Sequence, residues 1–173
     1  MKIFLLGYMG SGKSFLGEQL SAEMNMKFID LDELIVRNEG TSISEIFQKK
    51  GEVYFRRVER KTLEDLIELD EDVIVALGGG TPCYGNNMQL IKDSRETTSV
   101  YLKLNINTLT DRLLQEKDHR PMISHLKDRD QLLEFIGKHL FERNFYYNQS
   151  DYTIDCSEKS AKSIIGEIQQ QLK

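Results

Sequence analysis

The sequence predicts an α/β fold in which a parallel sheet is covered by helices on both faces. Five short β-prone runs, at residues 2–6, 27–29, 73–77, 98–104 and 152–154, alternate with segments whose apolar residues recur at helical spacing. Strands that are joined by crossover helices run parallel. Such sheets bind ligands beyond the carboxyl ends of their strands, so chemically active residues are expected there.

The helices are predicted from apolar spacing and, in one case, from a cap. Leu16, Leu20 and Met24 recur at intervals of four residues, which places them on one helix face. Ser42 stands three residues before Glu45, the pattern of a capping box. Two segments, residues 32–71 and 115–130, are longer than one crossover needs. Long insertions in compact domains usually form lids or binding segments.

The composition favours a single soluble domain over residues 1–173. The chain has 39% apolar and 29% charged residues, with 23 Lys and Arg against 28 Asp and Glu, a net charge of −5. Nucleic-acid binding through overall charge is therefore disfavoured, and an anionic ligand needs locally gathered cations. No run of residues is apolar for long enough to span a bilayer, and no signal peptide is recognisable. Because Cys83 and Cys156 are far apart, we expect free thiols and a cytoplasmic location.

Residues 7–14, Gly-Tyr-Met-Gly-Ser-Gly-Lys-Ser, match the G-x-x-x-x-G-K-[ST] phosphate-binding pattern. The motif follows a β-prone run and precedes a helical segment, as the chemistry requires. Its glycines let backbone N–H groups converge on a polyphosphate, and the helix N-terminus adds positive potential. Lys13 is expected to reach the β- and γ-phosphates, and the Ser14 hydroxyl to ligate Mg²⁺. The sequence therefore predicts a nucleoside triphosphate site.

Asp30 and Asp32 follow the second predicted strand, at the ligand-binding edge of the sheet. Near a magnesium nucleotide, one carboxylate could organise the water shell of the metal and the other could orient or deprotonate an acceptor hydroxyl. The alternative is that Asp32 simply caps the following helix. Position alone favours the two interpretations equally.

Three arginines, Arg56, Arg57 and Arg60, share one predicted helix with acidic residues at positions 52 and 59. The pattern is typical of a solvated helix face with weak ion pairs. The alternative is that one arginine grips a carboxylate with both prongs of its guanidinium, which suits this task better than a lysine.

The run 73–77 opens into three glycines, residues 78–80, followed by Pro82. Consecutive glycines cost backbone entropy, so they indicate close approach of a ligand to the main chain, or else a tight turn. This strand lacks the terminal Asp of a conventional Walker B strand, which weighs against motor ATPases, switch GTPases and helicases.

Arg120 and Pro121 lie in the polar segment 115–130, and Arg143 lies late in the next helix. An arginine on a mobile lid can neutralise a transferring phosphoryl group and exclude water. Both arginines could equally be solvated. The three histidines lack metal-ligand spacing, so no chemistry is assigned to them.

Taken together, these motifs resemble those of the shikimate kinases, which are P-loop kinases related to the nucleoside-monophosphate kinases. The matching elements occur in order between residues 7 and 143: the glycine loop, Asp30-x-Asp32, Gly51-Glu52-x-x-Phe55-Arg56-x-x-Glu59, the triple glycine, Arg120-Pro121 and Arg143. The resemblance implies ATP-dependent phosphorylation of the shikimate 3-hydroxyl on the pathway to chorismate and the aromatic amino acids. It also implies a monomer with a five-stranded parallel sheet, a substrate-binding segment at about 32–61 and a lid at about 115–124.

The resemblance further implies roles for particular residues. ATP would be held by the loop and the lid, with contacts from Gly10, Ser11, Gly12, Lys13, Ser14, Phe15 and Arg120. Shikimate would be held by Asp32, Arg56, Gly79 and Arg143, and the metal by Ser14 and Asp30. Lys13, Asp32 and Arg120 would be the catalytic residues, with Asp32 as the base.

Two departures from the family pattern and two alternatives remain. Phe145 stands where relatives often have Pro, which leaves the helix end near Arg143 undefined, and Leu31 replaces a frequent Thr or Ser. Arg112 and Lys159 are candidates for contacts to adenine. The alternatives are a kinase for another hydroxylated acid such as gluconate, and a nucleotide-binding regulator that has lost transfer activity.

Overall fold

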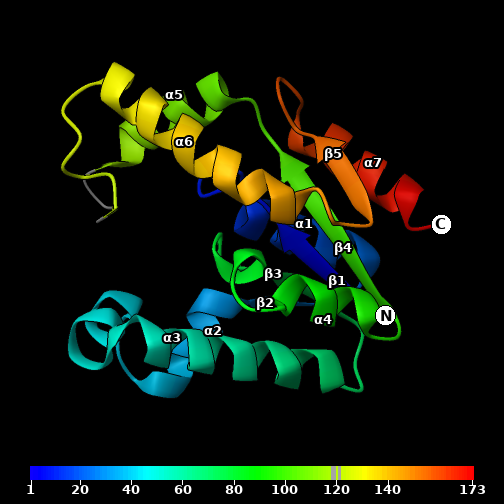
Figure 1. Ribbon diagram of the computed structural model, residues 1–173. Helices are drawn as coiled ribbons and strands as arrows, with labels where there is room; N and C mark the ends of the chain where they lie inside the picture. Colours follow the sequence, from blue (N-terminus) through cyan, green and yellow to red (C-terminus); the bar gives the residue numbers. More distant parts are fainter. Residues whose placement is uncertain (118–119, 121) are drawn as a thin grey trace.

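The computed structural model describes residues 1–117, 120 and 122–173. A five-stranded sheet lies at its centre, and helices pack around it (Figure 1). The strands are β1 (Lys2–Leu6), β2 (Lys27–Asp30), β3 (Val73–Ala76), β4 (Thr97–Lys103) and β5 (Tyr152–Asp155). The helices are α1 (Lys13–Met24), α2 (Leu31–Glu39), α3 (Ile43–Glu68), α4 (Asn87–Asp93), α5 (Ile106–Glu116), α6 (Arg129–Tyr147) and α7 (Ala161–Gln171), with a short 3-10 helix, η1 (Thr81–Cys83), before α4.

All strands of the sheet run parallel, in the order β2-β3-β1-β4-β5. Every residue of β1 and β3 is buried, as expected for strands covered on both faces. The predicted strand limits differ from the observed ones by no more than one residue at either end. The expectation of a five-stranded parallel sheet is therefore confirmed.

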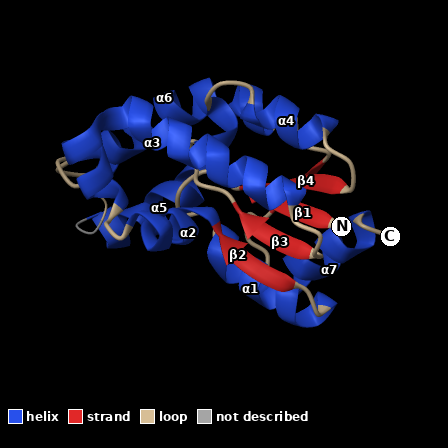
Figure 2. Cartoon of the chain, turned by 90° about the horizontal axis from the view of Figure 1, so that it is seen from below, coloured by secondary structure: helices blue, strands red, loops and turns tan. Residues whose placement is uncertain are grey.

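Helices cover both faces of the sheet, which gives the molecule three layers (Figure 2). Helices α1 and α7 pack on one face, whereas α3, α4 and α6 lie over the other. The chain leaves β1 toward β2 on one side but crosses from β3 to β4 on the other. The loops that follow the neighbouring strands β1 and β3 therefore diverge and leave a crevice at this edge.

The long segment between β2 and β3 forms two packed helices, α2 and α3. Ser42 begins α3 with both bonds of a capping box to Glu45, as predicted. Gly51 interrupts α3 with a φ of 83°, a left-handed conformation that favours glycine. This break, which apolar spacing did not reveal, lets the two parts of α3 point in different directions.

In the second long segment, residues 115–130, the part that lies between helices is shorter than the sequence suggests. Helix α5 continues to Glu116 and α6 begins at Arg129, after a cap by Asp128. Of the expected lid at 115–124, Asp118, His119 and Pro121 lie outside the described residues. Neither α4 nor η1 was predicted, because each is too short to show a period.

Two further expectations concern the thiols and the membrane. Cys83 is a half-buried free thiol and Cys156 a buried one. Among the described residues, none of the helices combines the length and apolar character that crossing a bilayer requires. No group of three or more His, Cys, Asp or Glu side chains suited to a metal ion occurs in the same part of the chain.

Candidate active site

The glycine loop connects β1 to the N-terminus of α1. Gly10 and Gly12 have φ values of 79° and 90°, so both positions require the freedom of glycine. The Nζ atom of Lys13 donates hydrogen bonds to the carbonyl oxygens of Gly7, at 2.9 Å, and Tyr8, at 3.1 Å. These bonds fold the side chain back over the loop, where its ammonium can meet an anion held by the loop amides.

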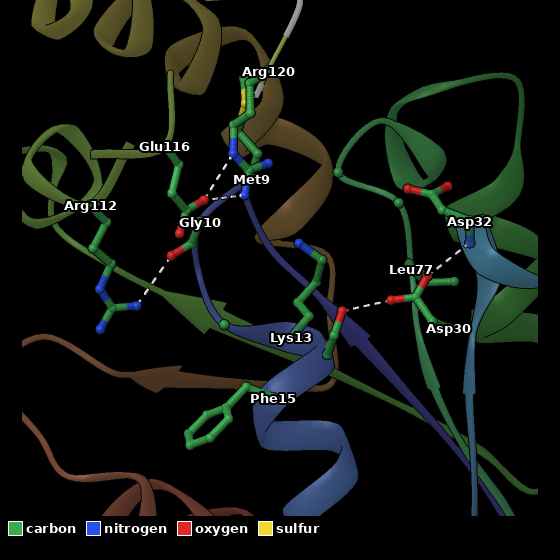
Figure 3. A pocket seen from close by; sticks show the side chains of 14 residues that line it. Met9, Gly10, Lys13, Phe15, Asp30, Asp32, Leu77, Arg112, Glu116 and Arg120 are labelled. Atoms are coloured by element: carbon green, nitrogen blue, oxygen red, sulfur yellow. Dashed lines mark hydrogen bonds and ion pairs between the residues drawn. The ribbon is translucent and has the colours of Figure 1, made fainter. Parts of the chain in front are cut away.

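Desolvation makes Lys13 unusually easy to deprotonate. Burial lowers the pKa of its ammonium from 10.5 to about 8, although the carboxylates of Asp32 and Asp30 oppose the change. In Figure 3, Lys13 rises between these two aspartates on one side and Arg120 on the other. A bound polyphosphate would place negative charge beside this lysine and would therefore favour its ammonium form.

Asp30, the last residue of β2, connects the glycine loop to the start of α2 through both of its carboxylate oxygens. Its Oδ2 accepts a hydrogen bond from the Ser14 hydroxyl at 2.6 Å (Figure 3). Its Oδ1 accepts from the backbone N–H groups of Asp32 and Glu33, so Asp30 is the N-cap of α2. The interpretation that Asp32 is the cap is therefore wrong, and the Asp32 side chain is left for the cavity. The intervening Leu31 is fully buried in the core.

The surroundings of Asp32 favour the protonated form of its carboxyl group. The pKa of its carboxyl is raised from 3.8 to about 6, chiefly by burial and further by the negative charges of Asp30 and Glu59. Lys13 and Arg56 partly offset this rise. A carboxylate with a pKa near neutrality is well suited to accept a proton from a substrate hydroxyl.

Each glycine of the triple repeat faces a charged side chain of the site. A Cβ atom on Gly78 would lie 2.8 Å from Oδ1 of Asp32, and one on Gly79 would lie 3.2 Å from Nη1 of Arg143. The Gly79 carbonyl also accepts a hydrogen bond of 2.6 Å from the Tyr147 hydroxyl. The glycines therefore provide room for the side chains of the site. From the sequence we expected the three glycines to serve an approaching ligand or a tight turn.

Arg56 lies against the third glycine of this run. A Cβ atom on Gly80 would lie 3.1 Å from Nη2 of Arg56. Nη1 of Arg56 donates to Glu59, at 2.8 Å, whose side chain is 2% exposed and also accepts from the Thr81 hydroxyl at 2.7 Å. The solvated-face interpretation is therefore wrong for Arg56, although Arg57 does lie on the exposed face.

Arg120 lies beside the glycine loop, near the end of α5. Its guanidinium donates to a single oxygen of Glu116, from Nη2 at 2.6 Å and from Nε at 3.0 Å (Figure 3). A partly exposed ion pair of this kind contributes about 0–1 kcal/mol, so an incoming anion can compete with Glu116. The neighbouring Pro121 is outside the described residues.

Two cavities meet at this edge of the sheet. The first, here called the loop cavity, has a volume of about 500 Å³ and is lined by Lys13, Ser14, Phe15, Asp30 and other residues of the loop. The second, the arginine cavity, has about 340 Å³ and is lined by Arg56, Arg143 and the apolar side chains of Ile43, Phe47 and Phe55. They share Met9, Asp32, Gly78, Gly79 and Arg120. The four cations predicted to bind phosphate or substrate, Lys13, Arg56, Arg120 and Arg143, therefore line one or both of these adjoining cavities.

A third, small cavity of about 100 Å³ contains the candidate adenine contacts. Arg112 and Lys159 both line it, and Phe15, which is 58% exposed, borders both this cavity and the loop cavity. Nη1 of Arg112 donates to the Gly10 carbonyl at 3.1 Å, and Lys159 pairs with Glu167 at 2.8 Å. Ser11 contributes a buried hydroxyl without a hydrogen-bond partner among the described residues.

Arg143 reaches the site from α6, which continues without interruption to Tyr147. Phe145 is 71% exposed on this helix, so its replacement of Pro does not turn Arg143 away. Some side-chain contacts near the site could not be predicted from the sequence. One is the hydrogen bond between the Tyr8 hydroxyl and Nδ1 of His139, at 2.9 Å, because the two residues are 131 positions apart.

A phosphate-binding loop beside a second cavity lined by arginines, joined at a carboxylate, defines a P-loop phosphotransferase. Comparisons with known proteins narrow this class. The family model described as "Shikimate kinase" matches residues 9–173. The chain belongs to the shikimate kinase family.

Individual relatives agree over nearly their whole length. The shikimate kinase of Flavobacterium psychrophilum is 45% identical over 167 residues, which cover 96% of each chain. The crystal structure of the Bacteroides thetaiotaomicron shikimate kinase matches with a TM-score of 0.90 and 34% identity, covering 99% of this chain and 98% of that one. The Acinetobacter baumannii enzyme, solved in complex with shikimate, matches with a TM-score of 0.84 and 30% identity, covering 99% and 92%.

Proposed function

We propose that this protein transfers the γ-phosphoryl group of ATP to the 3-hydroxyl of shikimate, giving shikimate 3-phosphate and ADP. The observation that carries the proposal is the junction of the loop cavity and the arginine cavity at Asp32 and Arg120. A donor on the loop and an acceptor among the arginines would meet at this junction. Membership of the shikimate kinase family supports the same reaction.

The arginine cavity suits a hydroxylated ring that bears a carboxylate. Arg56 and Arg143 would grip the carboxylate from two sides, and the Gly79 amide would contact the ring substituents. Ile43, Phe47 and Phe55 would cover the apolar part of the ring. Holding the acceptor at both ends aligns one hydroxyl with the donor, which is the main contribution of a kinase to phosphoryl transfer.

The junction residues would handle charge and protons during transfer. Asp32 would accept the hydroxyl proton, for which the raised pKa of about 6 suits it near neutral pH. Lys13 would neutralise the β- and γ-phosphates, and Arg120 would exchange Glu116 for the phosphates. The other loop contacts would come from Gly10, Ser11, Gly12, Ser14 and Phe15.

The oxygen donors beside the loop fit Mg²⁺. Ser14 and Asp30 present a hydroxyl and a carboxylate 2.6 Å apart, which are hard ligands of the kind that Mg²⁺ prefers. Mg²⁺ usually keeps waters and substrate phosphates as its remaining ligands, and this agrees with so small a protein set. The metal would neutralise phosphate charge, with Ser14 as its direct ligand and Asp30 bound to its waters.

The wider setting follows from the reaction. We propose a cytoplasmic monomer of one domain, residues 1–173, with no nucleic-acid or membrane partner, that acts in chorismate and aromatic amino-acid biosynthesis. Residues 32–61 would form the substrate-binding segment, and the described residues of the segment 115–124 would belong to a lid.

A coupled assay of ADP release with ATP, Mg²⁺ and shikimate tests the proposal. Shikimate-dependent turnover of at least about one per second is expected, within the ordinary range for kinases. Gluconate, which is also a hydroxylated carboxylate, is the matched acceptor control and should support little turnover. Folded protein that turns over only gluconate would contradict the proposed acceptor. Binding of both ligands without product in a single-turnover experiment would instead indicate a regulator.

A further inference from the structure

Tyr84 covers the guanidinium of Arg56. It follows η1 directly, so the turn after the triple glycine sets its position. The Cζ atom of Arg56 lies 3.5 Å from the centroid of the Tyr84 ring, against 5.0 Å for the ring of Phe55. A separation of 3.5 Å is ordinary van der Waals contact, so the cation rests directly on the aromatic face.

Tyr84 lies on the side of Arg56 that faces away from the acceptor. Arg56 lines the arginine cavity, and Tyr84 does not. Tyr84 instead borders two outer cavities of about 290 and 210 Å³, of which the first also contains Arg143 and the second also contains Arg56. The tyrosine therefore lies outside the lining of the arginine cavity, and we expect its effect on a substrate there to act through the arginine.

Hydrogen bonds alone leave the plane of the guanidinium weakly defined. Nη1 of Arg56 donates to Glu59, at 2.8 Å, and the Tyr84 hydroxyl also interacts with Arg56 and Glu52. Nε is buried without a hydrogen-bond acceptor among the described residues, and it lies 3.7 Å from a carboxylate oxygen of Glu52. A guanidinium held through one nitrogen atom can still rotate about that hydrogen bond. Two-pronged recognition of a carboxylate depends on the plane of the guanidinium, so a second constraint is needed.

We propose that Tyr84 is a positioning residue for Arg56. Its ring fixes the plane of the guanidinium so that the free nitrogen atoms meet the acceptor carboxylate in the right orientation. This inference rests on the proposed function, in which Arg56 binds the carboxylate of shikimate. It assigns to the residue after η1 a part in acceptor affinity that requires no contact with the acceptor.

Steady-state kinetics of Tyr84→Leu and Tyr84→Phe test the proposal. The leucine variant removes the aromatic face but keeps an apolar side chain, and the phenylalanine variant keeps the face but removes the hydroxyl. A stacked cation is expected to be worth roughly a three- to tenfold change in affinity. Tyr84→Leu should therefore raise the KM for shikimate by about that factor, with kcat and the KM for ATP within about twofold of wild type. Tyr84→Phe should restore the wild-type KM.

Two controls separate positioning from a general structural effect. In an Arg56→Lys background, Tyr84→Leu should raise the KM for shikimate by less than about twofold, because the group that it positions is gone. Tyr54→Leu removes another stack, on Lys50 at 4.4 Å, from a half-buried position of α3, the helix that carries Arg56. This variant should leave the KM for shikimate unchanged. If Tyr84→Leu proves unstable in thermal melts, Tyr84→Gln serves in its place.

Several results would overturn the proposal. They are an unchanged KM for shikimate in Tyr84→Leu, an equal rise in both KM values, or a phenylalanine variant that behaves like the leucine variant. Wild-type protein that does not turn over shikimate would instead remove the proposed function on which the inference rests. Because the wild-type measurement comes first, the two failures are distinguishable.

Discussion

The carboxylate of Asp32 occupies the space that a side chain at residue 78 would need. A Cβ atom on Gly78 would lie 2.8 Å from Oδ1 and 3.2 Å from Oδ2 of Asp32, and 3.0 Å from the Thr81 hydroxyl oxygen. Contacts under 3.0 Å require something to move, and because the backbone of Asp32 is fixed at the start of α2, its carboxylate is the group that would turn away. The absence of a side chain at residue 78 is thus a condition for the position of the carboxylate that we propose as the base.

Gly78→Ala is therefore expected to displace Asp32. We expect kcat to fall by more than about tenfold, since a displacement of about 1 Å costs up to about a hundredfold in rate. Gly166→Ala in α7 is the matched control, because a Cβ atom there meets nothing within 4 Å. The control should keep full activity and gain about 0.5–1 kcal/mol of stability. Equal activity of both variants would show that the position of the Asp32 carboxylate does not limit the rate.

Asp32→Asn should remove the acidic limb of the pH–rate profile. The wild-type carboxyl has a pKa of about 6, so kcat/KM should fall as the pH drops through about 6 and the base becomes protonated. The variant keeps the shape of the side chain but has no base, so we expect a loss of about a hundredfold or more in kcat with unchanged ATP affinity. The measurement is kcat/KM between pH 5 and 8. An acidic limb that persists in the variant would assign the titration to another group.

The same substitution should stabilise the folded protein above pH 6. The pKa of Asp32 is raised in the folded state, from 3.8 to about 6, so the folded protein binds the proton more tightly than the unfolded chain. Its contribution to stability is therefore full below about pH 4 and is lost as the pH rises to about 6. Asp32→Asn should be more stable than wild type by about 1–2 kcal/mol at pH 8, and by less at pH 4. Urea denaturation at the two pH values measures this difference, and a variant that is less stable at pH 8 would contradict it.

ATP binding should be accompanied by proton uptake near pH 8.5. In the free protein the pKa of Lys13 is lowered to about 8, so the lysine is largely neutral at that pH. Bound phosphates favour the ammonium form, and roughly half a proton or more should be taken up, with little uptake at pH 7. Calorimetry in buffers of different ionisation enthalpy detects this uptake. Lys13→Arg is the control, because a guanidinium stays protonated and should bind without uptake. Equal uptake in the variant would exclude Lys13 as the source.

Arg56→Lys should weaken shikimate binding much more than it slows transfer. A lysine replaces the two-pronged donor with a point charge, and it also leaves the buried Glu59 with a poorer partner. We expect the KM for shikimate to rise roughly ten- to a hundredfold, with a smaller change in kcat. Arg57→Lys, one position along the same helix on its exposed face, should have no effect. A similar KM in the two variants would show that Arg56 does not bind the carboxylate of shikimate.

Local patterns in the chain were sufficient to predict much of the fold and part of the site. Strand limits follow from short apolar runs, and the cap at Ser42 follows from hydrogen bonds within one turn. Lys13 and Ser14 could be identified because a phosphate loop places its functional groups within a few residues of one another. Such features depend on neighbours along the chain, so the sequence by itself determined them.

The tertiary structure decided which side chain meets which. It assigned the cap of α2 to Asp30 and not to Asp32, since only folded coordinates show that Asp30 bonds both Ser14 and the start of α2. It also placed Arg56 beside Tyr84, across a turn that has no sequence signature. The contacts of a buried charge depend on residues far away in sequence, and desolvation, which shifts the pKa values of Lys13 and Asp32, exists only once the layers have packed.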